Sequence, residues 1–391
     1  MSITSPTGLL INGDWVAGSQ RMDVFDPATG QSLAQVGDAT LDEALAAVTA
    51  ADEAFVTWSQ TAPRVRAEVL RRAWEIMTAE LEDCARLICL ENGKAWRDAM
   101  AEATYAAEFF RWFSEETVRV PGDFRLAPNG DKTIIVDHRP IGPALLITPW
   151  NFPAAMATRK IGPALAAGCT VVLKPPAETP LTALWVADVV QRAGAPKGVV
   201  NVITTRKSGE TVAALMADPR IATLSFTGST FVGKMLLHQA ADRALRASME
   251  LGGNAPFLVL EGADVDKAVA GAMIAKMRNG GAACTAANRF YVHASLVDEF
   301  AKKFGAALGA LKVGPGIDQS NDLGAMVSDK EAKKILELVE QAAAAGGDVI
   351  TTSSAPSHGA FVAPMIVRGI AHGSILTREE VFGPVAPIVT F

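Results

Sequence analysis

The sequence predicts an α/β protein in which a doubly wound parallel sheet is followed by a second α/β unit. Strands and helices alternate between residues 141 and 250, which is typical of a parallel sheet with helices on both faces. The alternation starts again after residue 255. A Pro128-Asn-Gly130 turn between short strand-forming runs at 123–138 predicts a β-hairpin, either an oligomerisation arm or an internal flap.

The first part of the chain predicts short strands and then helices. Turn residues at Asn12-Gly13 and at 26–30 separate short strands between residues 9 and 36. From 40 to 113 the apolar residues recur at helical spacing, with Thr40 placed to cap the first helix and Pro63 to open the next.

The two alternating regions can be assigned element by element. We expect strands at 144–148, 170–173, 199–203, 221–226, 256–260 and 290–293. We expect helices at 158–166, 181–192, from about 208, from 231, and at 265–277, 296–311 and 331–345. Sheets of this kind bind ligands at the carboxyl ends of their strands, so the site is expected there.

Composition and charge exclude several classes of function. A chain of 391 residues is too long for one small core, so two or three domains are expected. A net charge of −6 without a run of Lys or Arg argues against nucleic-acid and anionic-membrane partners. Residues 140–158 carry no charge, but four prolines exclude one regular membrane-spanning helix there.

The cysteine pattern indicates a reduced compartment. The four cysteines have no paired spacing and no neighbouring His cluster, which argues against disulfides and a metal site. The N-terminus does not show the basic region and apolar core of a secretory signal. We therefore expect a cytoplasmic protein.

Cys284 lies in a sequence environment unlike that of the other cysteines. Gly280, Gly281 and four alanines around it remove side-chain bulk, so backbone N–H groups and a substrate could approach the sulfur closely. A thiol has an ordinary pKa of about 8.5 and attacks at neutral pH only with help from a neighbouring group. Cys284 is therefore a candidate nucleophile; the alternative is a small buried packing residue.

Four polar, turn-forming segments directly follow expected strands, at 149–153, 174–176, 228–230 and 250–253. They should converge on one edge of the sheet. Gly228 and Gly233 fit a phosphate-binding turn at a helix start, although the middle Gly of the dinucleotide fingerprint is missing.

Three residues of these segments have candidate chemical roles, each with a structural alternative. Lys174 could reach ribose hydroxyls or a phosphate, or be a solvated surface lysine. Glu250 ends an apolar strand, where desolvation would raise its pKa and suit a general base; a structural ion pair is the alternative. Asn151 could donate to a developing oxyanion, or simply form a turn.

In combination, six motifs resemble those of the aldehyde dehydrogenase superfamily over nearly the whole chain. They are Pro149-Trp-Asn-Phe-Pro153, Lys174-Pro, Phe226-Thr-Gly-Ser-Thr230, Met249-Glu-Leu-Gly-Gly253, the Cys284 segment and Glu379-Glu-Val-Phe-Gly-Pro384. Each is weak alone, and the six in this order are specific. The resemblance implies a Rossmann-like dinucleotide-binding domain (1–122 and 141–252), an oligomerisation hairpin (123–140) and a catalytic domain (253–391).

The resemblance also implies roles for individual residues. Cys284 is the implied nucleophile, Glu250 the general base, and Asn151 together with the Cys284 backbone N–H the oxyanion hole. The implied cofactor contacts are Trp150, Lys174, Ala177, Gly228, Ser229, Leu251, Glu380 and Phe382. The implied reaction oxidises an aldehyde to a carboxylic acid through a thiohemiacetal and a thioester, without a metal.

Within the superfamily, residues 157–160 and 276–279 look like the succinate-semialdehyde dehydrogenase branch. Arginines matching Arg159 and Arg278 hold the substrate carboxylate there; ordinary ion pairs are the alternative. Ala177 stands where NAD-preferring relatives often carry a Glu, so we expect NADP rather than NAD, with Glu178 as an opposing feature.

Two departures from the family pattern affect these expectations. Ala286 replaces a second cysteine that forms a redox switch in some relatives, so no such internal disulfide is expected. Family members continue for several elements beyond Phe391, so we expect a C-terminally incomplete catalytic domain. Assembly into a homo-oligomer, a dimer or tetramer, would then need the missing segment.

Other interpretations remain open. The chain could be an aldehyde dehydrogenase of different specificity or a coenzyme-A-acylating variant, although Glu250 favours hydrolysis. It could be a folded but inactive fragment that binds nucleotide only. A thiol acyltransferase or hydrolase that uses Cys284 and Glu250 without nicotinamide is disfavoured, because no His is placed near either residue.

Overall fold

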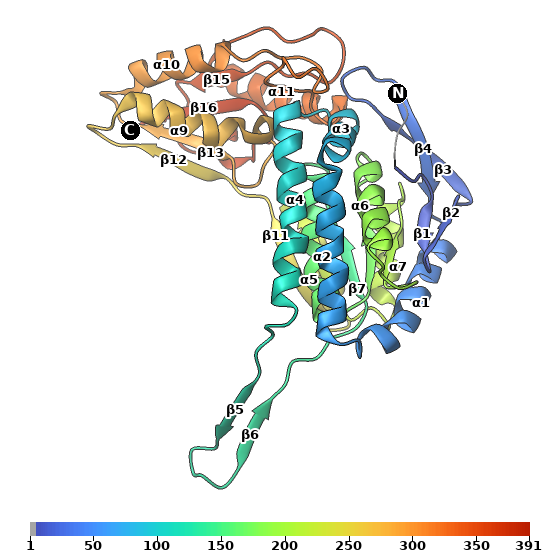
Figure 1. Cartoon of the computed structure of the whole chain (residues 1–391). Coiled ribbons are helices and arrows are strands. Elements are labelled where there is room, and N and C mark those ends of the chain that lie inside the picture. Colours follow the sequence, from blue (N-terminus) through green and yellow to red (C-terminus); the bar gives the residue numbers. More distant parts are fainter. Residues whose placement is uncertain (1–4) are drawn as a thin grey trace. The chain divides into compact units, whose positions relative to one another are not determined.

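The computed structural model describes residues 5–391, which divide into two compact units (Figure 1). Unit 1 comprises the described part of Met1–Val24 together with Ala34–Cys84 and Glu102–Glu250, and unit 2 comprises Phe25–Leu33, Ala85–Ala101 and Leu251–Phe391. Residues 25–33 and 85–101 thus belong with the second unit, although the sequence places them within the first domain. The reason for 85–101 is backbone packing, because Gly93 O accepts the Ala325 N–H at 2.9 Å.

Residues 5–251 supply a seven-stranded sheet, its helices and two separate two-stranded sheets. The strands of the seven-stranded sheet are β1 (Leu9–Ile11), β2 (Asp14–Val16), β7 (Ala144–Ile147), β8 (Val171–Lys174), β9 (Val200–Val202), β10 (Thr223–Gly228) and β11 (Arg246–Leu251). The helices are α1 (Leu41–Trp58), α2 (Pro63–Ala79), α3 (Leu81–Asn92), α4 (Trp96–Glu116), α5 (Pro153–Ala167), α6 (Pro180–Arg192), α7 (Ser208–Ala217) and α8 (Thr230–Ala241). The two-stranded sheets pair β3 (Gln20–Phe25) with β4 (Ser32–Asp38) and β5 (Asp123–Leu126) with β6 (Thr133–Val136).

The sheet of unit 1 is doubly wound, as the sequence predicts. Its strand order is β11-β10-β7-β8-β9-β1-β2, and β10, β7, β8 and β9 are parallel neighbours. The chain moves outward from β7 through β8 to β9, then returns to place β10 on the other side of β7. Right-handed crossovers therefore put α5 and α6 on one face and α7 and α8 on the other. The strand order reverses between β7 and β10, and that is where sheets of this kind bind ligands.

Helix α5 begins at Pro153, five residues before the expected start at Thr158. Proline suits the first position of a helix because its fixed φ is helical and the N–H that it lacks would have no partner there. The helix ends at Ala167, and the following Gly168, with a φ of 88°, forms a left-handed C-terminal cap. The early start places the turn at 149–152 directly between β7 and α5.

The predicted β-hairpin is present and projects from the body of unit 1 (Figure 1). Asp123 pairs with Val136 and Leu126 with Thr133 in an antiparallel register. Phe124 and Ile135 are exposed to 75% and 71%, so the hairpin displays apolar side chains on its surface.

Unit 2 contains a five-stranded sheet in the order β12-β13-β16-β15-β14. Its strands are β12 (Ala255–Val259), β13 (Ala287–Val292), β14 (Asp348–Thr351), β15 (Met365–Arg368) and β16 (Val385–Thr390). Its helices after residue 250 are α9 (Val265–Met277), the 3-10 helix η1 (Arg278–Gly281), α10 (Val297–Gly309), α11 (Asp329–Ala344) and α12 (Ile375–Arg378). The sequence reading included β12, β13, α9, α10 and α11, but not the last three strands or α12.

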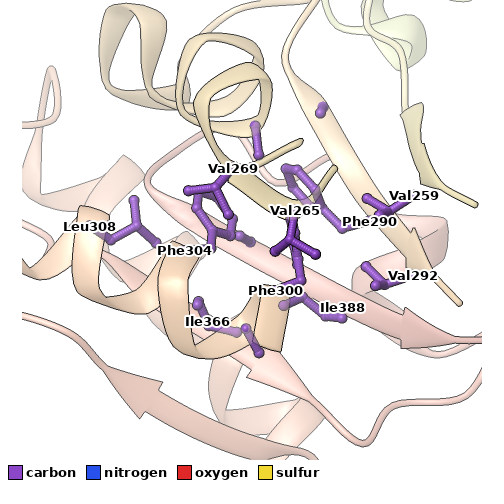
Figure 2. Close-up of a cluster of buried hydrophobic side chains, with 14 residues drawn as sticks. Val259, Val265, Val269, Phe290, Val292, Phe300, Phe304, Leu308, Ile366 and Ile388 are labelled. Atoms are coloured by element: carbon purple, nitrogen blue, oxygen red, sulfur yellow. The ribbon is translucent and has the colours of Figure 1, made fainter. Parts of the chain in front are cut away.

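A cluster of buried hydrophobic side chains, which includes three phenylalanines, forms a core of unit 2 (Figure 2). The ring of Phe290 on β13 lies 5.4 Å from that of Phe304 and 6.4 Å from that of Phe300, both on α10. Burial of each such side chain contributes about 1.5–3 kcal/mol. The cluster therefore anchors β13, and with it the Cys284 segment that immediately precedes this strand.

Within residues 5–391, no helix is long and apolar enough to cross a membrane.

Candidate active site

The register of the unit 1 sheet brings three predicted site segments to the same edge. Ile147 at the end of β7 pairs with Lys174 at the end of β8 and with Phe226 near the end of β10. The turns at 148–152, 175–179 and 228–229 therefore leave the sheet side by side at the point where the strand order reverses. This edge is the ligand-binding position of a doubly wound sheet.

Lys174 is buried, with 6% of its surface exposed, so the alternative of a solvated surface lysine is wrong. Burial lowers the pKa of Lys174 to about 8, while the negative charge of Glu178 opposes this shift. The chain therefore holds a desolvated amine at the strand end, where an anionic or hydroxyl ligand can accept from it.

The turn between β10 and α8 presents a helix N-terminus at the same edge. Ser229 is the N-cap of α8, and its hydroxyl accepts the Val232 N–H at 3.3 Å. A side chain at Gly228 would overlap the ring of Phe226, which favours glycine at this position. The remaining N–H groups of the first turn and the helix dipole favour an anion.

Two hydroxyls of this region are candidates for ligand contact. Within residues 5–391, the buried oxygens Thr148 Oγ1 and Thr227 Oγ1 have no hydrogen-bond partner. Buried polar groups in proteins are usually satisfied. An amine, two hydroxyls and a helix N-terminus at a strand-order reversal fit the sugar and phosphate groups of a dinucleotide.

Asn151 is buried in the turn before α5, and a buried carboxylate fixes this helix. Oε1 of Glu102, on α4, accepts the N–H groups of Ala154 at 2.9 Å and Ala155 at 3.3 Å. The N-cap residue Phe152 makes no side-chain cap bond of its own. Glu102 therefore caps α5 from another helix, a role that the sequence reading missed.

Glu250 is exposed at the end of β11, so the expected desolvation of its carboxylate is not found. Its charge instead acts on Lys160, a buried residue of α5. Burial lowers the pKa of Lys160 to about 8, while Glu250 opposes the shift and Arg159 adds to it. The ammonium of Lys160 lies 2.7 Å from Ser225 Oγ. Lys160 is a second residue that the sequence reading missed.

Arg159 is exposed on the same helix, next to Lys160. Its guanidinium lies 5.6 Å from the centre of the Phe109 ring. Stacking on a ring uses the face of the guanidinium and leaves its N–H edges available for planar acceptors such as carboxylates.

In unit 2, Cys284 is the exposed cysteine, and Cys84, Cys89 and Cys169 are buried. The alternative of a buried packing residue is therefore wrong for Cys284. The chain approaches it through three consecutive left-handed residues, Asn279, Gly280 and Gly281, with φ of 57°, 60° and 80°. The Asn279 side chain closes this turn by donating to Ala282 O at 2.9 Å. The thiol is thus displayed on a tightly folded loop.

Three predicted motifs meet within unit 2. The N–H of Gly253 donates to Glu380 Oε1 at 3.4 Å, and a side chain at Gly252 would overlap the same carboxylate. A side chain at Gly281 would overlap the carbonyl oxygen of Gly383. Burial raises the pKa of Glu380, opposed by the Gly253 N–H and by Lys334 and Lys276. The glycines permit close contact between the Glu380 segment and the other two motifs.

Comparison with known proteins agrees with this geometry. The model of the aldehyde dehydrogenase family matches residues 15–391. The chain belongs to the aldehyde dehydrogenase family. It is therefore an oxidoreductase, and the α/β fold predicted from the sequence, with a Rossmann-like unit 1, is confirmed.

Individual aldehyde dehydrogenases resemble the chain over most of its length. Succinate-semialdehyde dehydrogenase of Paenarthrobacter nicotinovorans is 51% identical over 361 residues, which cover 92% of this chain and 80% of that protein. The NADP(+) succinate-semialdehyde dehydrogenase GabD of Escherichia coli K12 is 43% identical, with 98% and 80% covered. The crystal structure of succinate-semialdehyde dehydrogenase from Burkholderia pseudomallei is 40% identical, with a TM-score of 0.96 and with 99% and 81% covered.

In this aldehyde dehydrogenase, Arg278 lies exposed at the start of η1. The positive charge of Arg278 acts on the carboxyl group of Asp98, a residue of α4. Burial raises the pKa of Asp98, and Lys94, the Asn279 N–H, Arg97 and Arg278 oppose the shift. Asp98 therefore accepts a hydrogen bond from the backbone of this turn and places a negative charge near the guanidinium, an arrangement that no sequence motif indicated.

No group of three or more His, Cys, Asp or Glu side chains in the described part of the chain could hold a metal ion.

Proposed function

We propose that this aldehyde dehydrogenase oxidises succinate semialdehyde to succinate, with NADP as its preferred cofactor and Cys284 as its nucleophile. The observation that carries the proposal is the exposed thiol on a left-handed loop, in a chain 51% identical to a succinate-semialdehyde dehydrogenase. The reaction needs an accessible thiol, a proton acceptor, an oxyanion site and a place for the cofactor.

The proposed chemistry starts at sulfur. The thiolate of Cys284 forms a C–S bond to the aldehyde carbon, and the carbonyl oxygen becomes an oxyanion that accepts from the Asn151 amide and the Cys284 backbone N–H. Re-formation of the carbonyl expels hydride and leaves a thioester; NADP, when bound, supplies the hydride acceptor. Glu250 then removes a proton from water, water attacks the thioester carbon, and the acid and the Cys284 thiolate are released.

The proposed cofactor contacts are Trp150, Lys174, Ala177, Gly228, Ser229, Leu251, Glu380 and Phe382. The amine of Lys174 and the N-terminus of α8 suit ribose and phosphate oxygens.

The preference for NADP over NAD rests on one position and one relative. Ala177 is half-buried and has no carboxylate to repel a 2′-phosphate. The Escherichia coli relative named above carries NADP(+) in its name. Glu178 next door is exposed, so its charge is screened by solvent.

Arg159 and Arg278 are the proposed partners of the substrate carboxylate. Both are exposed, and a guanidinium binds a carboxylate with two parallel hydrogen bonds. A dicarboxylic half-aldehyde offers a carboxylate to these guanidiniums, whereas a simple aliphatic aldehyde does not.

We also propose that the protein acts as a homo-oligomer in the cytoplasm. The apolar side chains of the β5–β6 hairpin, Phe124 and Ile135 among them, support a contact with a second copy. Four free cysteines support a reducing compartment.

The test of the proposed function is the appearance of reduced nicotinamide with succinate semialdehyde, measured with NADP and NAD in parallel. We expect turnover with the lower KM for NADP, no turnover in Cys284→Ala, and a raised substrate KM in Arg278→Met. A signal that persists in Cys284→Ala would remove the nucleophile from the proposal. Turnover of butyraldehyde as efficient as that of succinate semialdehyde would remove the substrate assignment.

A further inference from the structure

Lys276, the penultimate residue of α9, is completely buried. Among the largest fully buried side chains of residues 5–391, it is the charged one. Moving an ammonium out of water costs several kcal/mol unless polar partners compensate. A lysine in such a position needs specific partners, and the structure gives them.

The ammonium of Lys276 joins two segments that are distant in the sequence. It donates to Asn288 Oδ1 at 2.9 Å and to the carbonyl oxygen of Val381 at 3.0 Å. Asn288 lies on β13, four residues after Cys284. Val381 lies between Glu380 and Phe382. One side chain thus ties both flanks of the Cys284 loop to the Glu379–Pro384 segment.

The Cys284 loop and the Glu379–Pro384 segment also pack closely against their neighbours. A side chain at Gly281 would overlap the carbonyl oxygen of Gly383, and one at Gly383 would overlap Ile335. Asn254 Nδ2 adds bonds to Thr377 O at 3.0 Å and Glu379 O at 3.3 Å. The backbone geometry of the Glu379–Pro384 segment is therefore set by contacts at both ends, with Lys276 at its centre.

The electrostatic environment of Lys276 disfavours its charged form. Burial lowers the pKa of Lys276 to about 7, and the carboxylate of Glu380 opposes this shift. At a pH below this value the side chain carries its charge, and a charged donor in a dry site makes stronger hydrogen bonds than a neutral one.

We propose that Lys276 is a positioning residue that fixes Glu380 and Phe382 relative to the Cys284 loop, and through them sets the affinity for NADP. The inference rests on the proposed function, in which Glu380 and Phe382 contact the cofactor. Lys276 itself is enclosed by protein and acts only through the segments that it joins.

The test compares three variants of the full chain with the native protein. Lys276→Met removes both bonds, Lys276→Gln keeps an N–H donor without the charge, and Lys302→Met is a matched control on the exposed surface of α10. The dissociation constant of NADP is measured by titration calorimetry, which needs no turnover. The rate of Cys284 alkylation by iodoacetamide reports on the loop, and KM values for NADP and succinate semialdehyde are compared where the enzyme turns over.

We expect Lys276→Met to weaken NADP binding about tenfold, the effect of losing a charged hydrogen bond, with less than about a twofold change in the KM for the aldehyde. Lys276→Gln should recover part of the loss, and Lys302→Met should bind as the native chain does. A folded Lys276→Met protein with native NADP affinity would overturn the proposal. So would equal losses for cofactor and aldehyde, which indicate general structural damage.

If Lys276→Met does not fold, Asn288→Ala takes its place, because it removes one acceptor and leaves the bond to Val381. Native NADP affinity in that variant would then overturn the proposal, and weakened affinity with an unchanged aldehyde KM would support it. Calorimetry also separates this proposal from the proposed function. If the native chain binds NADP but does not oxidise succinate semialdehyde, the proposed function is wrong. The effect of Lys276 on NADP affinity can still be measured in that case.

Discussion

Replacement of Glu102 by alanine should destabilise the chain and also impair catalysis. Oε1 of Glu102 accepts the N–H groups of Ala154 and Ala155, and both alanines are 0% exposed. The variant leaves these donors buried without their acceptor, at about 1–3 kcal/mol each. We therefore expect the free energy of unfolding to fall by about 2–6 kcal/mol.

Glu102→Gln separates the hydrogen bonds from the charge. Glutamine keeps an acceptor oxygen but removes the negative charge at the N-terminus of α5, which contributes about 0.3–2 kcal/mol. Because Asn151 lies three residues before Ala154, a displaced helix start should move the proposed oxyanion donor. We expect Glu102→Gln to lower kcat at least about tenfold with a smaller change in substrate KM, the pattern of a lost transition-state contact.

The assay is urea denaturation followed by circular dichroism, with steady-state kinetics on the same preparations. Glu108→Ala is the control, because Glu108 lies on the same helix but is exposed and makes only a surface ion pair with Arg111 at 3.4 Å. It should change stability by less than about 0.5 kcal/mol. The reasoning is refuted if Glu102→Ala behaves like Glu108→Ala.

Three further predictions test other parts of the site. Iodoacetamide should add one group per native chain, detected by mass spectrometry, and none to Cys284→Ala, because the other cysteines are buried; rapid labelling of the variant would contradict this. Ser229→Ala should lower the free energy of unfolding by about 1 kcal/mol, because Ser229 caps α8. Ser229→Asp should keep the cap but weaken NADP binding more than Ser229→Ala does, since it adds a negative charge beside the proposed phosphate position. Native NADP affinity in Ser229→Asp would exclude that position. The pKa of Lys160 is about 8 in the folded chain and 10.5 ordinarily. Between these two pH values the unfolded state binds the proton and the folded state does not, so the free energy of unfolding rises with pH. Between pH 8 and 10 the native chain should gain about 2 kcal/mol relative to Lys160→Met in urea denaturation, and parallel pH profiles would show that Lys160 is not desolvated.

The strands of unit 1 could be predicted because each is a short apolar run that ends in a turn. The 144–147 and 171–174 strands are fully buried, as a parallel sheet requires, and their sequences show it directly. The last strands of unit 2 gave weaker signals. Strand β16 lies between β13 and β15, yet it contains Pro387, paired with Val367, and a proline normally argues against a central strand.

The candidate site was only partly predictable for a different reason. Turn residues such as Gly228 and Gly281 are visible in a sequence because only glycine fits where a neighbouring group is so close. Glu102, Lys160 and Lys276 are charged residues on helices, and charged residues are expected at the surface. Their burial depends on which elements pack against them, and a single sequence does not contain that information.

The buried lysines are informative because they are unfavourable for stability. Burial lowers the pKa of Lys160, Lys174 and Lys276, so each ammonium is held in the fold at the expense of its hydration. A well-packed apolar side chain in such a place is often neutral or stabilising. In each case a carboxylate opposes the shift, and these carboxylates are Glu250, Glu178 and Glu380. Two of the three, Glu250 and Glu380, are residues that the sequence motifs select for the reaction, and Lys174 is itself selected. Because their burial does not favour stability and they lie near proposed catalytic and cofactor residues, we expect these three lysines to serve the site rather than the stability of the fold.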